Sequence, residues 1–201
     1  MILYIMRHGE TYWNVARRMQ GKTDIALTEA GIEMAKISGK NMKDLPIDLC
    51  ISSPLIRATE TAKCVIGDRD IPLFTDERVQ EIGFGDWEGE CVIEENNISP
   101  EYMDLFFTDP IKCERPPKGE TFQDVQKRTG EFLEELIANP EYEDKHILIS
   151  SHGAAGRCLL SHFYEDKDDI WRGCVPPNCG VTIVEVVDGI KRVIEKDRVF
   201  Y

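Results

Sequence analysis

Three short runs of apolar residues, far apart along the chain, constrain the possible folds most strongly. In Ile2–Met6, Leu49–Ser53 and His146–Ser151, apolar and often β-branched residues follow one another without alternating with charged ones. A strand covered on both faces has this pattern, whereas a half-exposed strand alternates between apolar and polar residues. The sequence therefore predicts a sheet whose central strands are buried on both sides.

Helical segments separate these predicted strands. We expect helices over residues 28–42, from Pro54 onward, over 122–138 and over 155–163. Thr28 is a candidate N-cap, and proline is favoured in the first turn of a helix. Strands that alternate with helices predict an α/β fold, a three-layer sandwich in which a mostly parallel central sheet carries helices on both faces.

The remaining segments predict a hairpin and a cap within a single domain of residues 1–201. Val181–Val187 and Lys191–Glu195 resemble the two strands of a terminal hairpin. Residues 100–107 look helical between polar and proline-rich stretches, so the region 90–118 is the best candidate for a small, mobile cap insertion.

The charge balance excludes several classes of partner. The formal net charge is −13 and the sequence pI is near 4.8, whereas nucleic acid and anionic membranes attract basic surfaces. No apolar run approaches the roughly 18 residues that a membrane span needs. The seven cysteines form no CxxC pair and no signal peptide is visible, which favours a cytoplasmic protein without a metal site. The sequence does not exclude a homodimer.

Histidines and arginines follow the predicted strands at the edge where ligands bind in α/β sheets. Arg7 and His8 end the first run, Arg57 comes shortly after the second, and His152 follows the third. A neutral imidazole can act as a nucleophile, and the planar guanidinium of arginine matches the oxygens of a phosphate. This convergence predicts a site for phosphoryl transfer.

A leaving alkoxide also needs a proton from a general acid close to the phosphate. Glu81 is a candidate within a glycine-containing loop, and Glu77, Glu88 and Glu90 lie nearby. The chemistry of these carboxyl groups alone does not choose between them.

Several blocks of the chain resemble the histidine phosphatase superfamily, the phosphoglycerate mutase-like proteins. They appear in the family's order and span most of the chain. The blocks are Arg7–Asn14, continued by Arg18–Gly21 and by Asp24, Leu27, Thr28 and Gly31, then Ser52–Ala62, Glu81–Gly89, Gly119–Thr121 and Ser151–Gly153.

The resemblance implies a role for each matching residue. His8 is the expected phosphorylated nucleophile, and Glu81 the expected proton donor and later the base for water. Arg7, Arg57 and His152 complete the expected phosphate pocket. The resemblance implies a small-molecule phosphate ester as the substrate and a chemistry that needs no metal or other cofactor. The further positions that the resemblance places along the pocket are Asn14, Gln20, Gly21 and Gly153.

The cap favours phosphomonoester hydrolysis over the alternative, phosphoglycerate mutase-type transfer. Mutases of this superfamily carry an arginine pair and a lysine in the cap for the second anionic group of the substrate. Here the cationic residues between Gly89 and Gly119 are only Lys112, Arg115 and Lys118, among many carboxylates that include Glu94 and Glu95. A non-catalytic binding module is less expected, since the full catalytic set is present.

Overall fold

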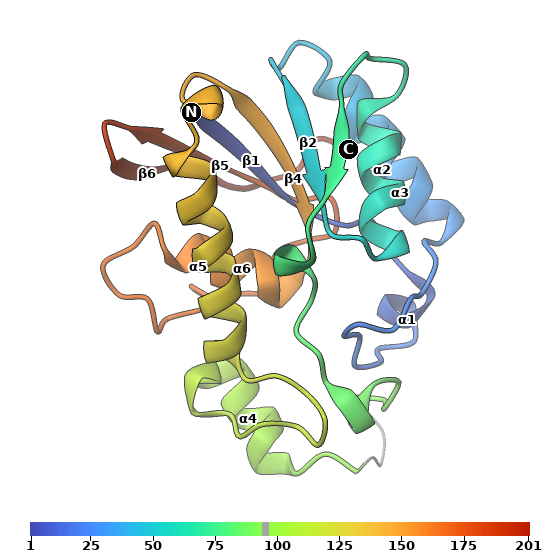
Figure 1. Ribbon diagram of the computed structural model, residues 1–201. Helices are drawn as coiled ribbons and strands as arrows, with labels where there is room; N and C mark the ends of the chain where they lie inside the picture. The colour runs from blue at the N-terminus through green and yellow to red at the C-terminus, as the bar shows by residue number, and fades with distance from the viewer. Residues whose placement is uncertain (94–96) are drawn as a thin grey trace.

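The computed structural model describes residues 1–93 and 97–201, which form one mixed sheet with helices around it (Figure 1). The strand order is β3-β2-β4-β1-β5-β6. The first four of these strands are parallel, whereas β5 and β6 run antiparallel to their neighbours. The strands are β1 (Ile2–Arg7), β2 (Leu49–Ser52), β3 (Leu73–Thr75), β4 (His146–Ser151), β5 (Val181–Val187) and β6 (Ile190–Arg198).

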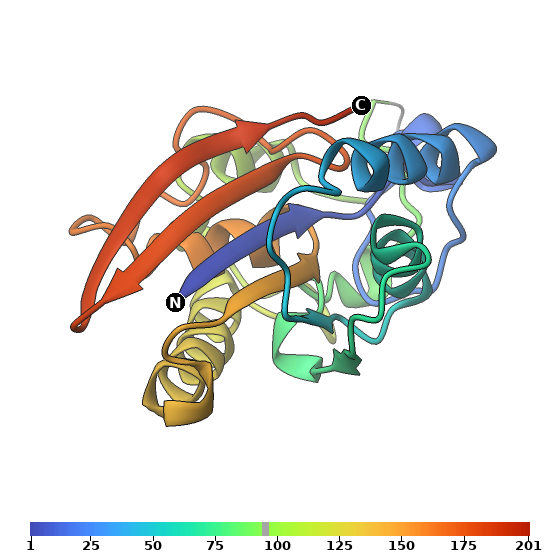
Figure 2. The same cartoon turned by 90° about the horizontal axis from the view of Figure 1, so that it is seen from above.

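Helices cover both faces of the sheet, as Figure 2 shows, so the predicted α/β sandwich is confirmed. Successive residues of β1 serve the two faces in turn. Leu3 and Ile5 pack against the core under α5 and α6, and Tyr4 and Met6 against the core under α2 and α3. This double burial explains the unbroken apolar run. The helices are α1 (Tyr12–Val15), α2 (Glu29–Asn41), α3 (Ile56–Ile66), α4 (Pro100–Thr108), α5 (Phe122–Ala138) and α6 (Gly153–Ser161).

Two helices begin at other residues than predicted. α3 starts at Ile56, two residues after Pro54, and its first N–H donates to the carboxylate of Asp24 at 2.8 Å. α6 starts at Gly153 instead of Ala155. At the N-cap of α2, the Thr28 hydroxyl accepts from the Gly31 N–H at 2.9 Å, as expected.

An aromatic cluster attaches helix α4, which lies in the predicted cap, to the main body. Phe106 is buried, and its ring lies 5.6 Å from that of Phe122 on α5 and 5.2 Å from that of Trp171. The indole N–H of Trp171 donates to the Phe106 carbonyl. Glu94 and Glu95, which we counted among the cap carboxylates, lie outside the described residues.

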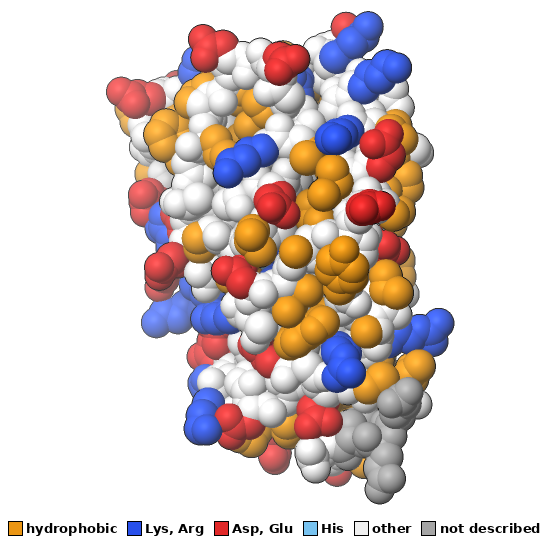
Figure 3. Space-filling model, turned by 90° about the vertical axis from the view of Figure 1, so that its right-hand side faces the viewer, with side chains coloured by type: hydrophobic (Ala, Val, Ile, Leu, Met, Phe, Trp, Pro, Cys, Tyr) orange, Lys and Arg blue, Asp and Glu red, His pale blue; other side chains and the backbone are white. Residues whose placement is uncertain are grey.

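The surface mixes acidic, basic and apolar side chains. On the face shown in Figure 3, hydrophobic side chains gather around the middle, where α1 lies, between scattered charged ones. Tyr12 and Val15 of α1 are both exposed. Within the described part of the chain, no helix combines the length and the hydropathy that crossing a membrane requires.

Candidate active site

His8 and His152 meet at the carboxyl ends of two adjacent parallel strands. β1 and β4 pair in a register that sets Arg7 opposite Ser151, and each histidine is the next residue. The His8 N–H donates to the Ser151 carbonyl at 3.0 Å. The two rings lie edge to face with centroids 5.2 Å apart, and both side chains are buried. The sheet thus brings the two predicted histidines together.

The ring of His8 is held so that one particular nitrogen is available. Its Nδ1 lies 2.7 Å from the carbonyl oxygen of Gly9. Because a carbonyl oxygen only accepts, Nδ1 carries the hydrogen and Nε2 keeps its lone pair. Burial, followed by the positive charges of Arg57 and Arg7, holds the pKa of His8 well below its usual value. The imidazole is therefore neutral at physiological pH and suited to nucleophilic attack.

Backbone carbonyls hold the two predicted arginines. Arg57 is fully buried and donates from Nη1 to the Thr23 carbonyl at 3.0 Å and from Nη2 to the Gly21 carbonyl at 2.6 Å. Arg7 donates from Nη1 to the Pro176 carbonyl at 2.6 Å. Burial lowers the pKa of Arg57 to about 10 and also lowers that of Arg7. Arg57 therefore keeps its positive charge at neutral pH. The carbonyl contacts fix both guanidinium groups, and the Nε atom of each has no hydrogen-bond partner among the described residues.

Several buried nitrogen atoms around His8 have no hydrogen-bond partner within the described residues. They are Nε of Arg7, Nε of Arg57, Nε2 of Gln20 and both ring nitrogens of His152. Leaving a buried donor unsatisfied costs about 1–3 kcal/mol. Burial holds the pKa of His152 well below its usual value, so its ring is neutral and only one of its two nitrogens donates. Together with the N–H groups of Gln20 and the two arginines, it presents donors and positive charge that suit an anion with several oxygens, such as a phosphoryl group.

Glu81 lies at the N-terminus of α6, within the same site. Its Oε1 accepts from the N–H groups of Ile82 and Ala155, both at 2.9 Å, and its Oε2 accepts from the Ala154 N–H at 3.2 Å. A Cβ atom built on Gly153 would lie 3.6 Å from Glu81 Oε2 and 3.8 Å from Arg7 Nε. The carboxylate is thus fixed beside Arg7, where the predicted phosphate site would require a proton donor.

A cavity of about 220 Å³ opens beside His8 and collects most of the predicted site residues. Arg57 and His152 are buried and do not line the cavity. Gly21 does not line it either, and its carbonyl accepts a hydrogen bond from Arg57. The predicted residues along the cavity are Arg7, His8, Asn14, Gln20, Glu81 and Gly153. Arg18 and an apolar group complete the lining: Met19, Phe84, Val92, Met103, Phe106, Phe107, Ala154, Trp171 and Val175.

Asn14 and Gln20 form part of a side-chain network that includes a residue missed from sequence. Asn14 Nδ2 donates to Gln20 Oε1 at 3.2 Å. Asn178 Nδ2 donates both to the Asn14 side-chain oxygen at 3.1 Å and to the His8 carbonyl at 3.0 Å. Asn178 therefore ties the backbone of His8 to the amide of Asn14. No local pattern around Asn178 indicates this contact.

Three further charged residues support the loops of the site. Arg128 on α5 donates to the Glu81 carbonyl at 3.0 Å and pairs with Glu120, which accepts from the Gly83 N–H at 2.9 Å. Glu88 accepts from the Lys22 N–H at 2.8 Å and from the Phe84 N–H at 3.2 Å. It thereby links the loop that holds Arg57 to the loop of Glu81. For Arg128 a signal existed, since a charge interrupts the apolar face of its helix between Val125 and Phe132.

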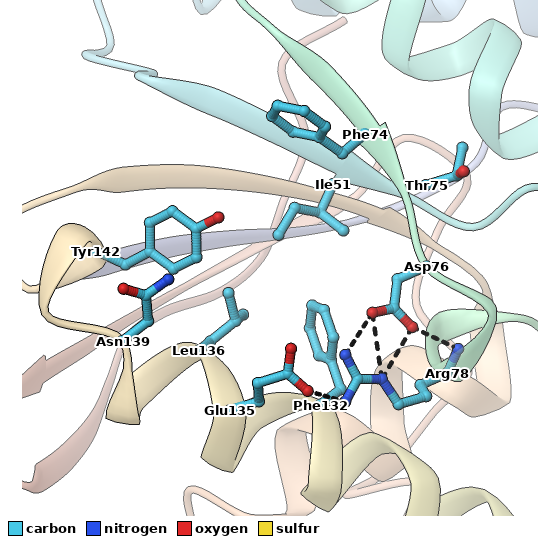
Figure 4. A pocket seen from close by; sticks show the side chains of 10 residues that line it. All are labelled: Ile51, Phe74, Thr75, Asp76, Arg78, Phe132, Glu135, Leu136, Asn139 and Tyr142. Carbon is cyan, nitrogen blue, oxygen red and sulfur yellow. Dashed lines mark hydrogen bonds and ion pairs between the residues drawn. The ribbon is translucent and has the colours of Figure 1, made fainter.

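A second hollow lies away from this site, between β2, β3 and the carboxyl end of α5 (Figure 4). The guanidinium of Arg78 lies there between the carboxylates of Asp76 and Glu135, each 2.6 Å away. The residues that line it include no site residue predicted from sequence. Within residues 1–93 and 97–201, no three His, Cys, Asp or Glu side chains are grouped to share a metal ion.

Comparisons with known proteins show the family of the chain. A model of the histidine phosphatase superfamily (branch 1) matches residues 3–196. Probable phosphoglycerate mutase GpmB of Yersinia pestis (strain Pestoides F) is 34% identical over 161 residues, 79% of this chain and 73% of that protein. The structure of Bacillus stearothermophilus YhfR aligns with a TM-score of 0.90 and 38% identity over 98% of this chain and 97% of that one.

A third relative is named as a phosphatase. Mycobacterial glucosyl-3-phosphoglycerate phosphatase Rv2419c, solved in complex with VO3, aligns with a TM-score of 0.87 and 26% identity over 98% of each chain. The range of the family model includes most of β1, the Glu81 loop and β4. The chain therefore belongs to branch 1 of the histidine phosphatase superfamily.

Proposed function

We propose that this protein hydrolyses small-molecule phosphomonoesters through a phosphohistidine formed on His8. The observation that carries the proposal is the state of the His8 ring. Its Nδ1 is committed to the Gly9 carbonyl, which leaves a neutral Nε2 beside the cavity and among unsatisfied buried donors. A nucleophile placed next to fixed positive charge is what phosphoryl transfer requires of a protein.

The reaction takes two steps. Nε2 of His8 attacks phosphorus, and the ester oxygen leaves as an alcohol after receiving a proton from Glu81. The Glu81 carboxylate then takes a proton from water, whose oxygen attacks the phosphohistidine and releases inorganic phosphate. Arg7, Arg57 and His152 stabilise the charge on the phosphoryl oxygens in both steps, so the proposed mechanism requires no metal ion or other cofactor.

The cap supports hydrolysis over mutase-type transfer. Lys112 pairs with Asp109 at 2.6 Å, Arg115 with Asp124 at 2.7 Å, and Lys118 with Asp86 at 2.9 Å.

None of these three cations is among the residues that line the cavity beside His8. Among the described residues that line the cavity, Arg18 is the one cation outside the proposed catalytic residues that could meet a second anionic group, and its Nη1 already donates to the Gly89 carbonyl at 2.5 Å. The relatives carry both names, phosphoglycerate mutase and phosphatase, so the distinction depends on an assay.

The test is a phosphate-release screen of the purified protein between pH 5 and 8, with interconversion of phosphoglycerates measured in parallel. His8→Ala should abolish release, and His146→Ala, at the opposite end of β4, should retain it. An acid-labile mass increase of one phosphoryl group on the wild type would identify the intermediate, and EDTA should leave the rate unchanged. Interconversion without release would instead favour the mutase, and full activity in His8→Ala would remove His8 as the nucleophile.

A further inference from the structure

The outer wall of the cavity beside His8 is apolar. Four of its side chains, Val92, Met103, Phe107 and Val175, are at least partly accessible, whereas the other large apolar residues of the lining are buried. Phe107 is 56% exposed although it follows a buried aromatic residue on the cap helix α4. These accessible side chains can therefore contact the apolar part of a molecule in the cavity.

Packing beneath this wall holds it in place. The ring of Phe107 lies edge to face on that of Phe106, with centroids 5.0 Å apart and an interplanar angle of 87°. Phe106 in turn contacts Phe84, Phe122 and Trp171 within the core under the cap. An aromatic side chain with a fixed base presents its area at a low cost in conformational entropy.

The wall adjoins the place where a leaving group must lie. Val175 Cγ1, Glu81 Oε2 and Arg7 Nε lie 3.4, 3.6 and 3.8 Å from the position of a Cβ atom on Gly153. These three groups therefore surround one small volume. An ester oxygen that takes a proton from Glu81 is next to this volume, so the carbon chain that follows it continues over Val175 towards the rest of the apolar wall.

We infer that Val92, Met103, Phe107 and Val175 form a subsite for the leaving group, and that Phe107 determines specificity for alcohols with an apolar or aromatic body. This inference rests on the proposed function and names its substrate class. When the apolar part of a substrate packs against this wall, the free energy of binding becomes more favourable in proportion to the apolar area removed from water. In the part of the lining that the structure describes, Arg18 is the one charged side chain outside the proposed catalytic residues, and its guanidinium donates to the Gly89 carbonyl.

The test uses n-alkyl phosphates, because their alcohols have almost equal acidity and differ mainly in apolar area. From ethyl through butyl to hexyl phosphate, kcat/KM should rise roughly two- to fourfold for each methylene that the wall covers. Phe107→Ala should lower the ratio of kcat/KM for hexyl over ethyl phosphate at least severalfold. Phe74→Ala is the matched control, since this exposed phenylalanine of β3 lies in the second hollow (Figure 4) and should leave the ratio unchanged.

A ratio near one in the wild type, or an equal ratio in Phe107→Ala, would overturn the subsite. So would faster turnover of 3-phosphoglycerate than of hexyl phosphate together with loss of that advantage in Arg18→Gln. The p-nitrophenyl ester separates the two proposals. If it is hydrolysed in a His8-dependent way while the alkyl ratio stays flat, only the subsite is wrong. If no ester is hydrolysed in that way, the proposed function is wrong as well.

Discussion

The guanidinium of Arg128 lies 3.0 Å from the backbone oxygen of Glu81 and thereby connects a helix to the proposed proton donor. It also donates to the carbonyls of Arg78 and Gln80, both at 2.7 Å. Residues 81–84 belong to no helix or strand. Side-chain hydrogen bonds from α5 therefore hold the backbone of Glu81 in place, as a strand does for His8, while N–H groups of Ile82 and α6 orient its carboxylate.

Arg128→Lys should reduce turnover without removing it. Lysine cannot donate to three carbonyls from one planar group, so the Glu81 loop loses part of its support. For alkyl phosphates, whose leaving group depends on protonation, kcat should fall roughly ten- to a hundredfold, because small displacements of a catalytic group are costly. p-Nitrophenyl phosphate should be affected less. Arg115→Lys, on the cap surface, is the control, and equal losses on both esters would contradict a role through Glu81.

Glu81→Gln should separate esters by their leaving group. The amide cannot give up a proton as a carboxyl group does, so alkyl phosphates should slow far more than p-nitrophenyl phosphate. The side-chain NH2 group of glutamine, which donates, would also face at least one of the N–H donors of Ile82, Ala154 and Ala155. We expect a loss of about 1 kcal/mol in unfolding free energy from this mismatch, measured by denaturant titration. A parallel loss on both esters would point to a different general acid.

The two glycines predicted to line the pocket should respond differently to alanine. A Cβ atom on Gly21 would lie 2.2 Å from Glu88 Oε1 and 2.7 Å from the Ile82 carbonyl oxygen, so Gly21→Ala should cost about 1–3 kcal/mol of stability. On Gly153 the nearest atom would be Val175 Cγ1 at 3.4 Å, an ordinary contact.

Gly153→Ala should therefore keep the melting temperature of the wild type. Its methyl group would occupy the volume between Glu81 and Arg7, so kcat/KM should fall. Thermal unfolding and steady-state kinetics on both variants check this division. A destabilised Gly153→Ala, or a fully active one, would contradict the position that we assign to the substrate.

The acid limb of the pH–rate profile should lie below the usual range of histidine. Burial, and then the charges of Arg57 and Arg7, lower the pKa of His8, so a proton reaches Nε2 only well below about pH 6.5. Attack requires the unprotonated form, and kcat/KM should therefore persist on acidification past that pH before it falls. The substrate phosphate ionises near pH 6 and must be titrated separately.

Arg57→Gln removes one of the charges that lower the pKa of His8. In this variant the rate should drop and the acid limb should move to higher pH. An unmoved limb would show that the charge of Arg57 does not contribute to the low pKa of His8.

The elements of the fold that depend on local pattern were predictable, and those that depend on distant groups were not. α5 and β4 have the predicted bounds, because an amphipathic period and an apolar run define them. The starts of α3 and α6 were wrong by two residues. In both helices a carboxylate from another segment, Asp24 or Glu81, accepts the first free N–H groups, and no neighbouring residue reveals it.

The same distinction holds for the site. His8 and His152 could be placed together because strand order determines where parallel strands end. Arg128, Glu88 and Asn178 act on backbone or amide groups 47, 66 and 170 residues away in the chain. The sequence marks Arg128 as a charge on the apolar face of its helix, but the partners of all three residues become visible only when the loops are folded against one another. The orientation of the aromatic residues on α4 was also not predictable from sequence. Phe107 lines the cavity, whereas Tyr102 packs in the core.

The pairing of β1 with β4 on one side and β5 on the other has a consequence for biosynthesis. The ribosome makes the strand that carries His8 early, but both neighbours of that strand emerge only near the end of the domain. A nascent chain that stops before Asn178 already contains His8, His152 and Glu81, yet it lacks Asn178 and the strand β5, which pairs with β1. Catalytic competence should therefore appear abruptly, when the last hairpin closes over the first strand.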